Sequence, residues 1–106
     1  MKSSELLIII PAFNESGNIQ KTIKMITHTP EFDYVIINDC STDNTLEICR
    51  ENKFNVIDLP INLGIGGAVQ TGYLYAVQNN YQYAVQIDGD GQHNPEYIRS
   101  MLQRIK

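Results

Sequence analysis

The stretch Val85-Gln86-Ile87-Asp88-Gly89-Asp90-Gly91-Gln92-His93 joins an apolar run to two carboxylates that are spaced two residues apart. Side chains at positions i and i+2 of an extended strand point to the same side, so Asp88 and Asp90 are expected to converge. Converging carboxylates repel each other, and a hard divalent cation with oxygen ligands relieves that repulsion. The stretch therefore predicts a Mg²⁺ or Mn²⁺ site at the end of a strand. The alternative is a polar Asp-Gly turn between a strand and a helix, since both residue types are common in turns.

Three further short apolar runs precede this one, and each is followed by a polar loop. Together the four runs predict strands over residues 6–10, 34–37, 55–59 and 83–87. The run at 6–10 lacks alternation, which is typical of a strand that is buried on both faces. We expect Pro11 to end the first strand, because proline has no N–H to donate to a ladder.

Apolar residues at helical spacing appear between the strands and after the last one. Ile19, Ile23 and Ile26 predict a first helix with Ser16 as its N-cap. A short second helix is predicted around residues 46–49, and a fourth is predicted after residues 94–95. The third helix opens at residue 64, and its narrow face is expected to lie on the sheet. The residues of that face are Ile65, Ala68, Val69, Gly72 and Ala76.

The order βαβαβαβα predicts a Rossmann-like α/β fold with a parallel sheet and helices on both faces. In open sheets of this kind, ligands bind beyond the carboxyl ends of the strands. Polar clusters follow all four predicted strands, at Asn14-Glu15, Asn38-Asp39, residues 62–67 and Asp88-Gly89-Asp90. Their convergence on one edge favours a ligand site over an isolated turn.

The chain has 106 residues, which is enough for one domain, residues 1–106, but not for two. It carries 8 basic and 12 acidic residues, for a net charge of −4, and has no basic cluster. This charge argues against nucleic acid as a partner. Cys40 and Cys49 are the only cysteines, and they lack the spacing of a metal site. We therefore expect two reduced thiols in a cytoplasmic protein.

Four motifs resemble those of the family 2 glycosyltransferases, in order along the chain. Ile8-Ile9-Ile10-Pro11-Ala12-Phe13-Asn14-Glu15 is similar to the opening strand of that family, and Asn38-Asp39-Cys40-Ser41-Thr42-Asp43-Asn44-Thr45 is similar to its second-strand motif. Residues 62–68 with Gly72 resemble its third motif, and Asp88-Gly89-Asp90-Gly91-Gln92-His93-Asn94-Pro95 resembles its DxD motif. The Gln-His pair is most similar to polyprenyl-phosphate sugar synthases, such as the dolichyl-phosphate mannose synthases. Members of this family are inverting enzymes of the GT-A fold that use nucleotide-diphosphate sugars.

The resemblance implies a site for a UDP- or GDP-sugar donor with Mg²⁺ or Mn²⁺ as cofactor. It places Asp39 against the base and most of the other substrate-binding positions around the nucleoside. The implied substrate-binding residues are Pro11, Ala12, Asn14, Glu15, Asp39 and Asp88. The implied metal ligands are Asp88, Asp90 and Gln92. The implied acceptor is a lipid phosphate, such as polyprenyl phosphate, or a sugar.

Three positions depart from the usual pattern of that family. Asn38 stands where Asp is usual, Cys40 stands where Gly is common, and Ile65 lies in a loop where many relatives carry Lys or Arg. Because Ile65 is apolar, a packing role for the glycines of its loop is at least as expected as phosphate contact.

By the same resemblance, GT-A domains are about twice as long as this chain. We therefore interpret the chain as the N-terminal, nucleotide-binding half of a glycosyltransferase, with any membrane contact made by segments absent from it. No residue is a good candidate for a general base, and an anionic lipid-phosphate acceptor needs none. Two alternatives stay open: a haloacid-dehalogenase-like phosphatase with Asp88 as nucleophile, and a non-catalytic α/β binding module. Apolar surface that a half-domain leaves uncovered could drive formation of a homodimer.

Overall fold

Strands and helices alternate along the chain in the computed structural model, which describes residues 5–27, 32–88, 100 and 103–104. The elements are β1 (Leu6–Ala12), α1 (Ile19–Thr27), β2 (Asp33–Asn38), α2 (Thr45–Glu51), β3 (Val56–Asp58), α3 (Gly64–Gln78) and β4 (Tyr83–Gln86). This alternation confirms the predicted α/β class. The fourth predicted helix falls largely outside the described residues.

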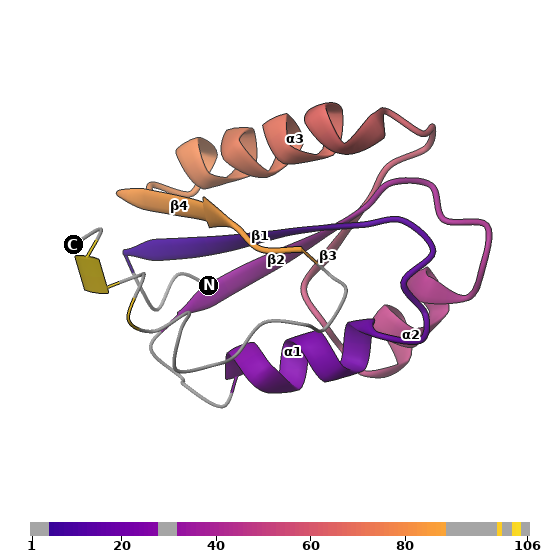
Figure 1. Cartoon of the computed structure of the whole chain (residues 1–106). Coiled ribbons are helices and arrows are strands. Elements are labelled where there is room, and N and C mark those ends of the chain that lie inside the picture. Colours follow the sequence, from indigo (N-terminus) through magenta and orange to yellow (C-terminus); the bar gives the residue numbers. More distant parts are fainter. Residues whose placement is uncertain (1–4, 28–31, 89–99, 101–102, 105–106) are drawn as a thin grey trace.

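The four strands form one parallel sheet in the order β3-β2-β1-β4. Figure 1 shows three layers, with α3 covering one face of the sheet and α1 and α2 covering the other. The prediction of a parallel sheet with helices on both faces is therefore confirmed. β1 pairs with a strand on each side, so the loop that follows it lies at the middle of the carboxyl edge.

The sheet separates two apolar cores, and β1 contributes alternate side chains to both. Leu6, Ile8 and Ile10 pack into the core on the side of α1 and α2. Leu7 and Ile9 pack into the core on the side of α3. All five are fully buried, which is why the run lacks the alternation of a half-exposed strand.

The longest described helix, α3, lies on the sheet through a row of small side chains. Ala68, Gly72 and Ala76 are buried, as predicted for that face, whereas Ile65 is 63% exposed, so its placement there was wrong. Ile65 belongs to the first turn of the helix, where it lines a cavity at the edge of the sheet. No helix in the described part of the chain is long and apolar enough to cross a membrane.

Two of the predicted end signals, at Pro11 and Ser16, were wrong. β1 continues through Pro11 to Ala12, whose carbonyl accepts a hydrogen bond from the Asp39 N–H. The backbone of Ile9 bonds to the β4 side of the strand, where its carbonyl accepts from the Ile87 N–H. The Pro11 nitrogen, two residues later, points to the same side. Because the pairing with β4 ends at Ile9, the missing N–H of Pro11 costs no ladder hydrogen bond. The N-cap assignment of Ser16 was also wrong, because α1 begins three residues later, at Ile19. The Ser16 N–H donates instead to Asp43, in the loop after β2.

Candidate functional site

A cavity of about 320 Å³ lies at the carboxyl edge of the sheet. Its walls come from the end of β1 and the loop after it, the residue after β2, the first turns of α3, and the second residue after β4. The lining residues are Pro11, Ala12, Phe13, Glu15, Asp39, Ile65, Ala68 and Asp88. The structure thus brings five of the six predicted substrate-binding residues to one cavity, the exception being Asn14.

Asp39 is the most buried polar side chain in this lining. It is 4% exposed, and its Oδ1 accepts a hydrogen bond of 2.7 Å from the Leu63 N–H, just before α3. Its own N–H donates to the Ala12 carbonyl at 2.9 Å, which fixes its backbone to β1. No hydrogen bond from the described residues reaches the second carboxylate oxygen, Oδ2. Asp39 therefore offers the cavity one acceptor whose position is fixed from two sides.

The lining is acidic, with carboxylates from Glu15, Asp39 and Asp88 and no basic residue among those described. Asp88 is exposed, and its Oδ1 accepts a hydrogen bond of 3.4 Å from Gln86 Nε2. The other two predicted metal ligands, Asp90 and Gln92, lie outside the described residues. Within residues 5–27 and 32–88, no group of three or more His, Cys, Asp or Glu is placed to hold a metal ion. The oxygen donor set of the cavity is nevertheless of the kind that Mg²⁺ and Mn²⁺ prefer.

Asn14 joins two loops instead of lining the cavity. Its backbone has a φ of 55°, in the left-handed region that Asn tolerates better than most residues. Its Oδ1 accepts hydrogen bonds from the N–H groups of Thr42 at 2.8 Å and Asp43 at 3.2 Å. Its own N–H donates to the Ser41 hydroxyl at 3.0 Å. Asn14 thereby ties the loop after β1 to the loop after β2.

Asp43 makes a second set of bonds between the same two loops. Its Oδ1 accepts from both the N–H and the hydroxyl of Thr45, and its Oδ2 accepts from the Ser16 N–H at 3.2 Å. Desolvation by burial acts to raise the pKa of Asp43, but the hydrogen bonds from Thr45 and Ser16 outweigh it and lower the pKa to about 2. The Glu15 N–H donates to the Thr45 hydroxyl at 3.0 Å.

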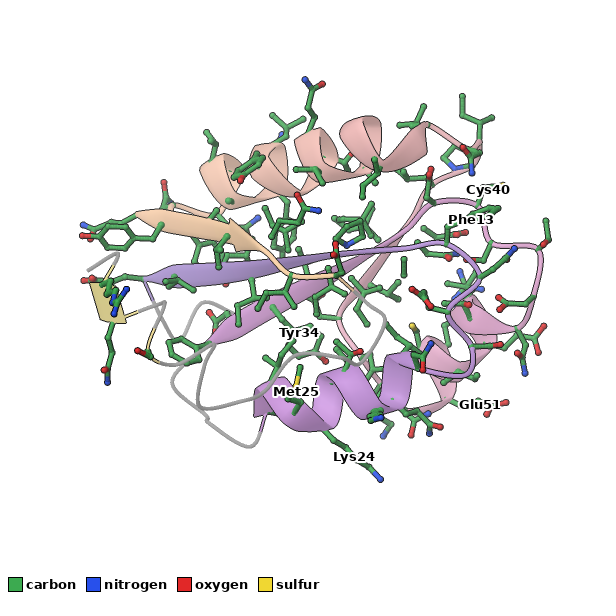
Figure 2. All side chains as sticks on the ribbon, in the orientation of Figure 1. Phe13, Lys24, Met25, Tyr34, Cys40 and Glu51 are labelled. Carbon is green, nitrogen blue, oxygen red and sulfur yellow. The ribbon has the colours of Figure 1, made fainter. Side chains whose placement is uncertain are left out.

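Sequence reasoning missed three residues of the cavity lining, Phe13, Ile65 and Ala68. Phe13 is 48% exposed, and Figure 2 shows it near Cys40, at the end of the molecule where β1 and β2 stop. An aromatic residue inside an otherwise polar loop was the signal available for Phe13. For Ile65, the signal was an exposed apolar residue in the first turn of a helix that begins at the same edge.

A larger cavity, of about 610 Å³, lies near the amino ends of β2 and β3 and contains none of the predicted site residues. Phe32, Tyr34 and Tyr81 are among its lining residues. The Tyr81 hydroxyl donates to Asp33 Oδ2 at 2.7 Å, and burial together with this carboxylate raises the pKa of Tyr81. Since ligands of parallel sheets bind at the carboxyl edge, we regard the smaller cavity as the candidate site.

The fold and the cavity define a parallel α/β domain with an acidic ligand site beyond the carboxyl ends of its strands. The chain belongs to Glycosyl transferase family 2, whose sequence profile matches residues 7–106. It is 31% identical to a UDP-N-acetylglucosamine–dolichyl-phosphate N-acetylglucosaminyltransferase of Methanococcus voltae, over 99% of this chain and 49% of that protein. The chain spans about half the length of the curated relatives that it matches. The phosphatase and binding-module alternatives are therefore not supported.

Solved structures show the same fold. The structure of S. aureus TarS in complex with UDP-GlcNAc matches with a TM-score of 0.72 and 26% identity, over 94% of this chain and 30% of TarS. Glucosyl-3-phosphoglycerate synthase from Mycobacterium tuberculosis, in complex with Mn²⁺, UDP and phosphoglyceric acid, matches with a TM-score of 0.72 and 19% identity, over 94% of this chain and 38% of the synthase. The second match is a likeness of fold alone. Both confirm the predicted GT-A architecture.

Proposed function

We propose that this chain binds the nucleotide-diphosphate sugar donor of an inverting glycosyltransferase, together with a divalent metal ion. The observation that carries the proposal is the composition of the cavity at the carboxyl edge, which combines a fixed acceptor, an exposed aromatic ring and three carboxylates without a basic residue among the described lining. A diphosphate is itself anionic, so it can enter such a cavity only with a cation that neutralises both partners.

Asp39 is the proposed contact for the base. Both uracil and guanine carry an imide-type N–H, and a fixed carboxylate oxygen accepts such a donor well. The hydrogen bond from the Leu63 N–H holds Oδ1 in place and leaves Oδ2 for the ligand. Phe13, half-exposed at the rim, offers an aromatic face on which a base can stack.

Asp88 is the proposed metal ligand of the described part, with Asp90 and Gln92 as the further ligands that the DxD resemblance implies. When bound, the metal ion supplies positive charge against the diphosphate, whose own charge grows as the glycosyl bond breaks. The position of Asp88 two residues after β4 fits this role, since its exposed carboxylate lies in the same lining as Asp39 and Glu15.

The proposed acceptor is a polyprenyl phosphate, and a sugar acceptor is the alternative. Support comes from the Methanococcus voltae relative, whose name includes a dolichyl phosphate. A phosphate acceptor is already anionic and needs no general base. We propose a cytoplasmic domain that works at the membrane surface, where a lipid phosphate is available.

Thermal unfolding with and without UDP, GDP and Mn²⁺ tests the proposal. A ligand at about 100 times its Kd adds about 2.7 kcal/mol of stability, which corresponds to several degrees for a domain of this size. We expect a shift that requires both a nucleotide and Mn²⁺ and that disappears in Asp88→Asn. Glu51→Gln is the matched control, because Glu51 is an exposed carboxylate at the end of α2 and is not among the residues that line the cavity. No metal-dependent shift with either nucleotide, or an unchanged shift in Asp88→Asn, would refute the proposed donor site.

A further inference from the structure

Two loops meet at the mouth of the cavity, and side chains of the second loop hold the backbone of the first. The first loop, residues 13–18, connects β1 to α1 and carries Phe13 and Glu15 of the cavity lining. The second loop, residues 39–44, connects β2 to α2. The Glu15 carbonyl accepts hydrogen bonds from the Asn18 and Ile19 N–H groups, at the start of α1. The N–H groups of Asn14, Glu15 and Ser16 have no such backbone partner and donate instead to side chains of residues 41–45.

Thr45, at the start of α2, is central to the first set of these bonds. It is fully buried, although it is polar. Its hydroxyl accepts a hydrogen bond of 3.0 Å from the Glu15 N–H and donates its own proton to Asp43 Oδ1. A hydroxyl has one proton and two lone pairs, so this side chain can serve both partners at once. The Glu15 backbone is thereby connected through Thr45 to a carboxylate.

A second set of bonds holds the neighbouring residue, Asn14, from the other side. The Asn14 N–H donates to the Ser41 hydroxyl, which in turn donates to Asn38 Oδ1. The Asn38 amide completes the series by donating to Asp58 Oδ1 at 2.9 Å. Two consecutive residues of the first loop are therefore anchored by separate series of side chains, one ending at Asp43 and the other at Asp58.

We propose that Thr45 is a positioning residue for nucleotide binding, which holds the Glu15 backbone in its binding arrangement before the ligand arrives. The inference rests on the proposed donor site, because it concerns how that site is formed. Thr45 does not line the cavity, so it acts only through the loop that it holds. If only a fraction of the molecules has the loop in its binding arrangement, the apparent Kd equals the intrinsic Kd divided by that fraction.

The test compares Thr45→Val, which removes the hydroxyl while keeping the shape, with Thr45→Ser, which keeps it. Thr71→Val is the matched control, because the Thr71 hydroxyl donates only to the Gly67 carbonyl within α3, outside the cavity lining. Two quantities are measured: the Kd of UDP or GDP with Mn²⁺, and the hydrogen-exchange rate of the Glu15 amide without ligand. The Ile36 amide, which donates to the Asn55 carbonyl in the sheet, reports any global loss of stability.

We expect Thr45→Val to weaken nucleotide binding about three- to tenfold and to speed exchange at Glu15 more than at Ile36. Thr45→Ser and Thr71→Val should both bind like the unmodified chain. If Thr45→Val does not fold, Asp43→Ala takes its place, because it removes the exposed acceptor of the Thr45 hydroxyl and should loosen the same loop.

An unchanged Kd in Thr45→Val overturns the inference, whatever happens to the Glu15 amide. If the unmodified chain binds neither nucleotide, the proposed function fails for this chain, and the exchange rates then judge the inference by themselves. In that case, a larger increase of the exchange rate at Glu15 than at Ile36 in Thr45→Val supports a loop held by Thr45, and equal increases overturn it.

Discussion

Replacing Gly72 by Ala should destabilise the packing of α3 on the sheet, because no room exists for a methyl group between them. A Cβ at this position would lie 2.3 Å from Ile9 Cγ2, 2.9 Å from Cγ1 and 3.1 Å from Cδ1. Carbon atoms in contact are about 3.5–4.0 Å apart, so the first overlap exceeds about 1 Å. Ile9 is fully buried on the central strand and is β-branched, so neither its backbone nor its side chain can retreat easily.

The expected change in the free energy of unfolding of Gly72→Ala is the difference between two opposing effects. Overpacking of a core costs about 1–3 kcal/mol, whereas Ala in place of Gly within a helix gains about 1 kcal/mol. Because the overlap involves three atoms of one side chain, we expect a net loss of about 1–2 kcal/mol in the free energy of unfolding. Gly66→Ala is the matched control in the same helix, since its Cβ would meet nothing within 4 Å. That variant should gain up to about 1 kcal/mol.

Urea unfolding followed by circular dichroism measures both variants. The gap in the free energy of unfolding between them, about 1–3 kcal/mol, corresponds to about 4–24 °C in Tm for a domain of this size. Ile9→Ala removes all three of the opposing atoms, so Gly72→Ala should cost less in that background, by about 0.5–3 kcal/mol of coupling. Equal stability of Gly72→Ala and Gly66→Ala, or the same cost of Gly72→Ala in both backgrounds, would refute the steric reasoning.

Three further substitutions test other parts of the structure. Thr22→Val should leave stability unchanged or raise it by up to about 1 kcal/mol in urea unfolding, because the buried Thr22 hydroxyl has no hydrogen-bond partner among the described residues; a large loss would reveal a partner. In the folded state Asp43 has a pKa of about 2, below the ordinary 3.8, so its carboxylate contributes stability that is present above pH 4 and is lost as the pH falls towards 2. Asp43→Asn should therefore make the free energy of unfolding less dependent on pH between about 4 and 2. The same pH dependence of the free energy of unfolding in the variant and the unmodified chain would contradict this. Cys40→Gly should be about 1 kcal/mol more stable than Cys40→Ala in thermal unfolding, since Cys40 has a φ of 56° and only glycine adopts that region freely; an equal Tm would argue against backbone strain.

The fold could be predicted because its strongest determinant is local and apolar. The run at 6–10 is buried on both faces in the structure, as its lack of alternation indicated. The errors arose where a neighbouring element decides the outcome. Pro11 continues β1 because β4 pairs no further than Ile9, and nothing in the sequence around Pro11 reveals where β4 stops. Ile65 fits the helical period of the buried face, but its turn lies at the edge of the sheet and borders the cavity instead.

The candidate site could be predicted to the extent that it depends on strand ends. Parallel strands deliver their carboxyl ends to one edge, so Asp39 and Asp88 reach the same cavity although 49 positions separate them (88 minus 39). Asn14 could not be placed in this way. Its side chain points to a loop 28 residues away because its backbone is left-handed, a conformation that its sequence permits but does not require. The assignments of Asp90 and Gln92 stay predictions.

Two departures from the usual family motif are explained by the scaffold around the cavity. Asn38 is buried and uses its amide to donate to Asp58 on β3, whereas an aspartate in its place would set two carboxylates against each other. Cys40 adopts a positive φ, which accounts for the frequent glycine at this position. Neither side chain lines the cavity. The base contact that we propose involves Asp39 and Phe13, so the Asn38 and Cys40 departures give no reason to withdraw it.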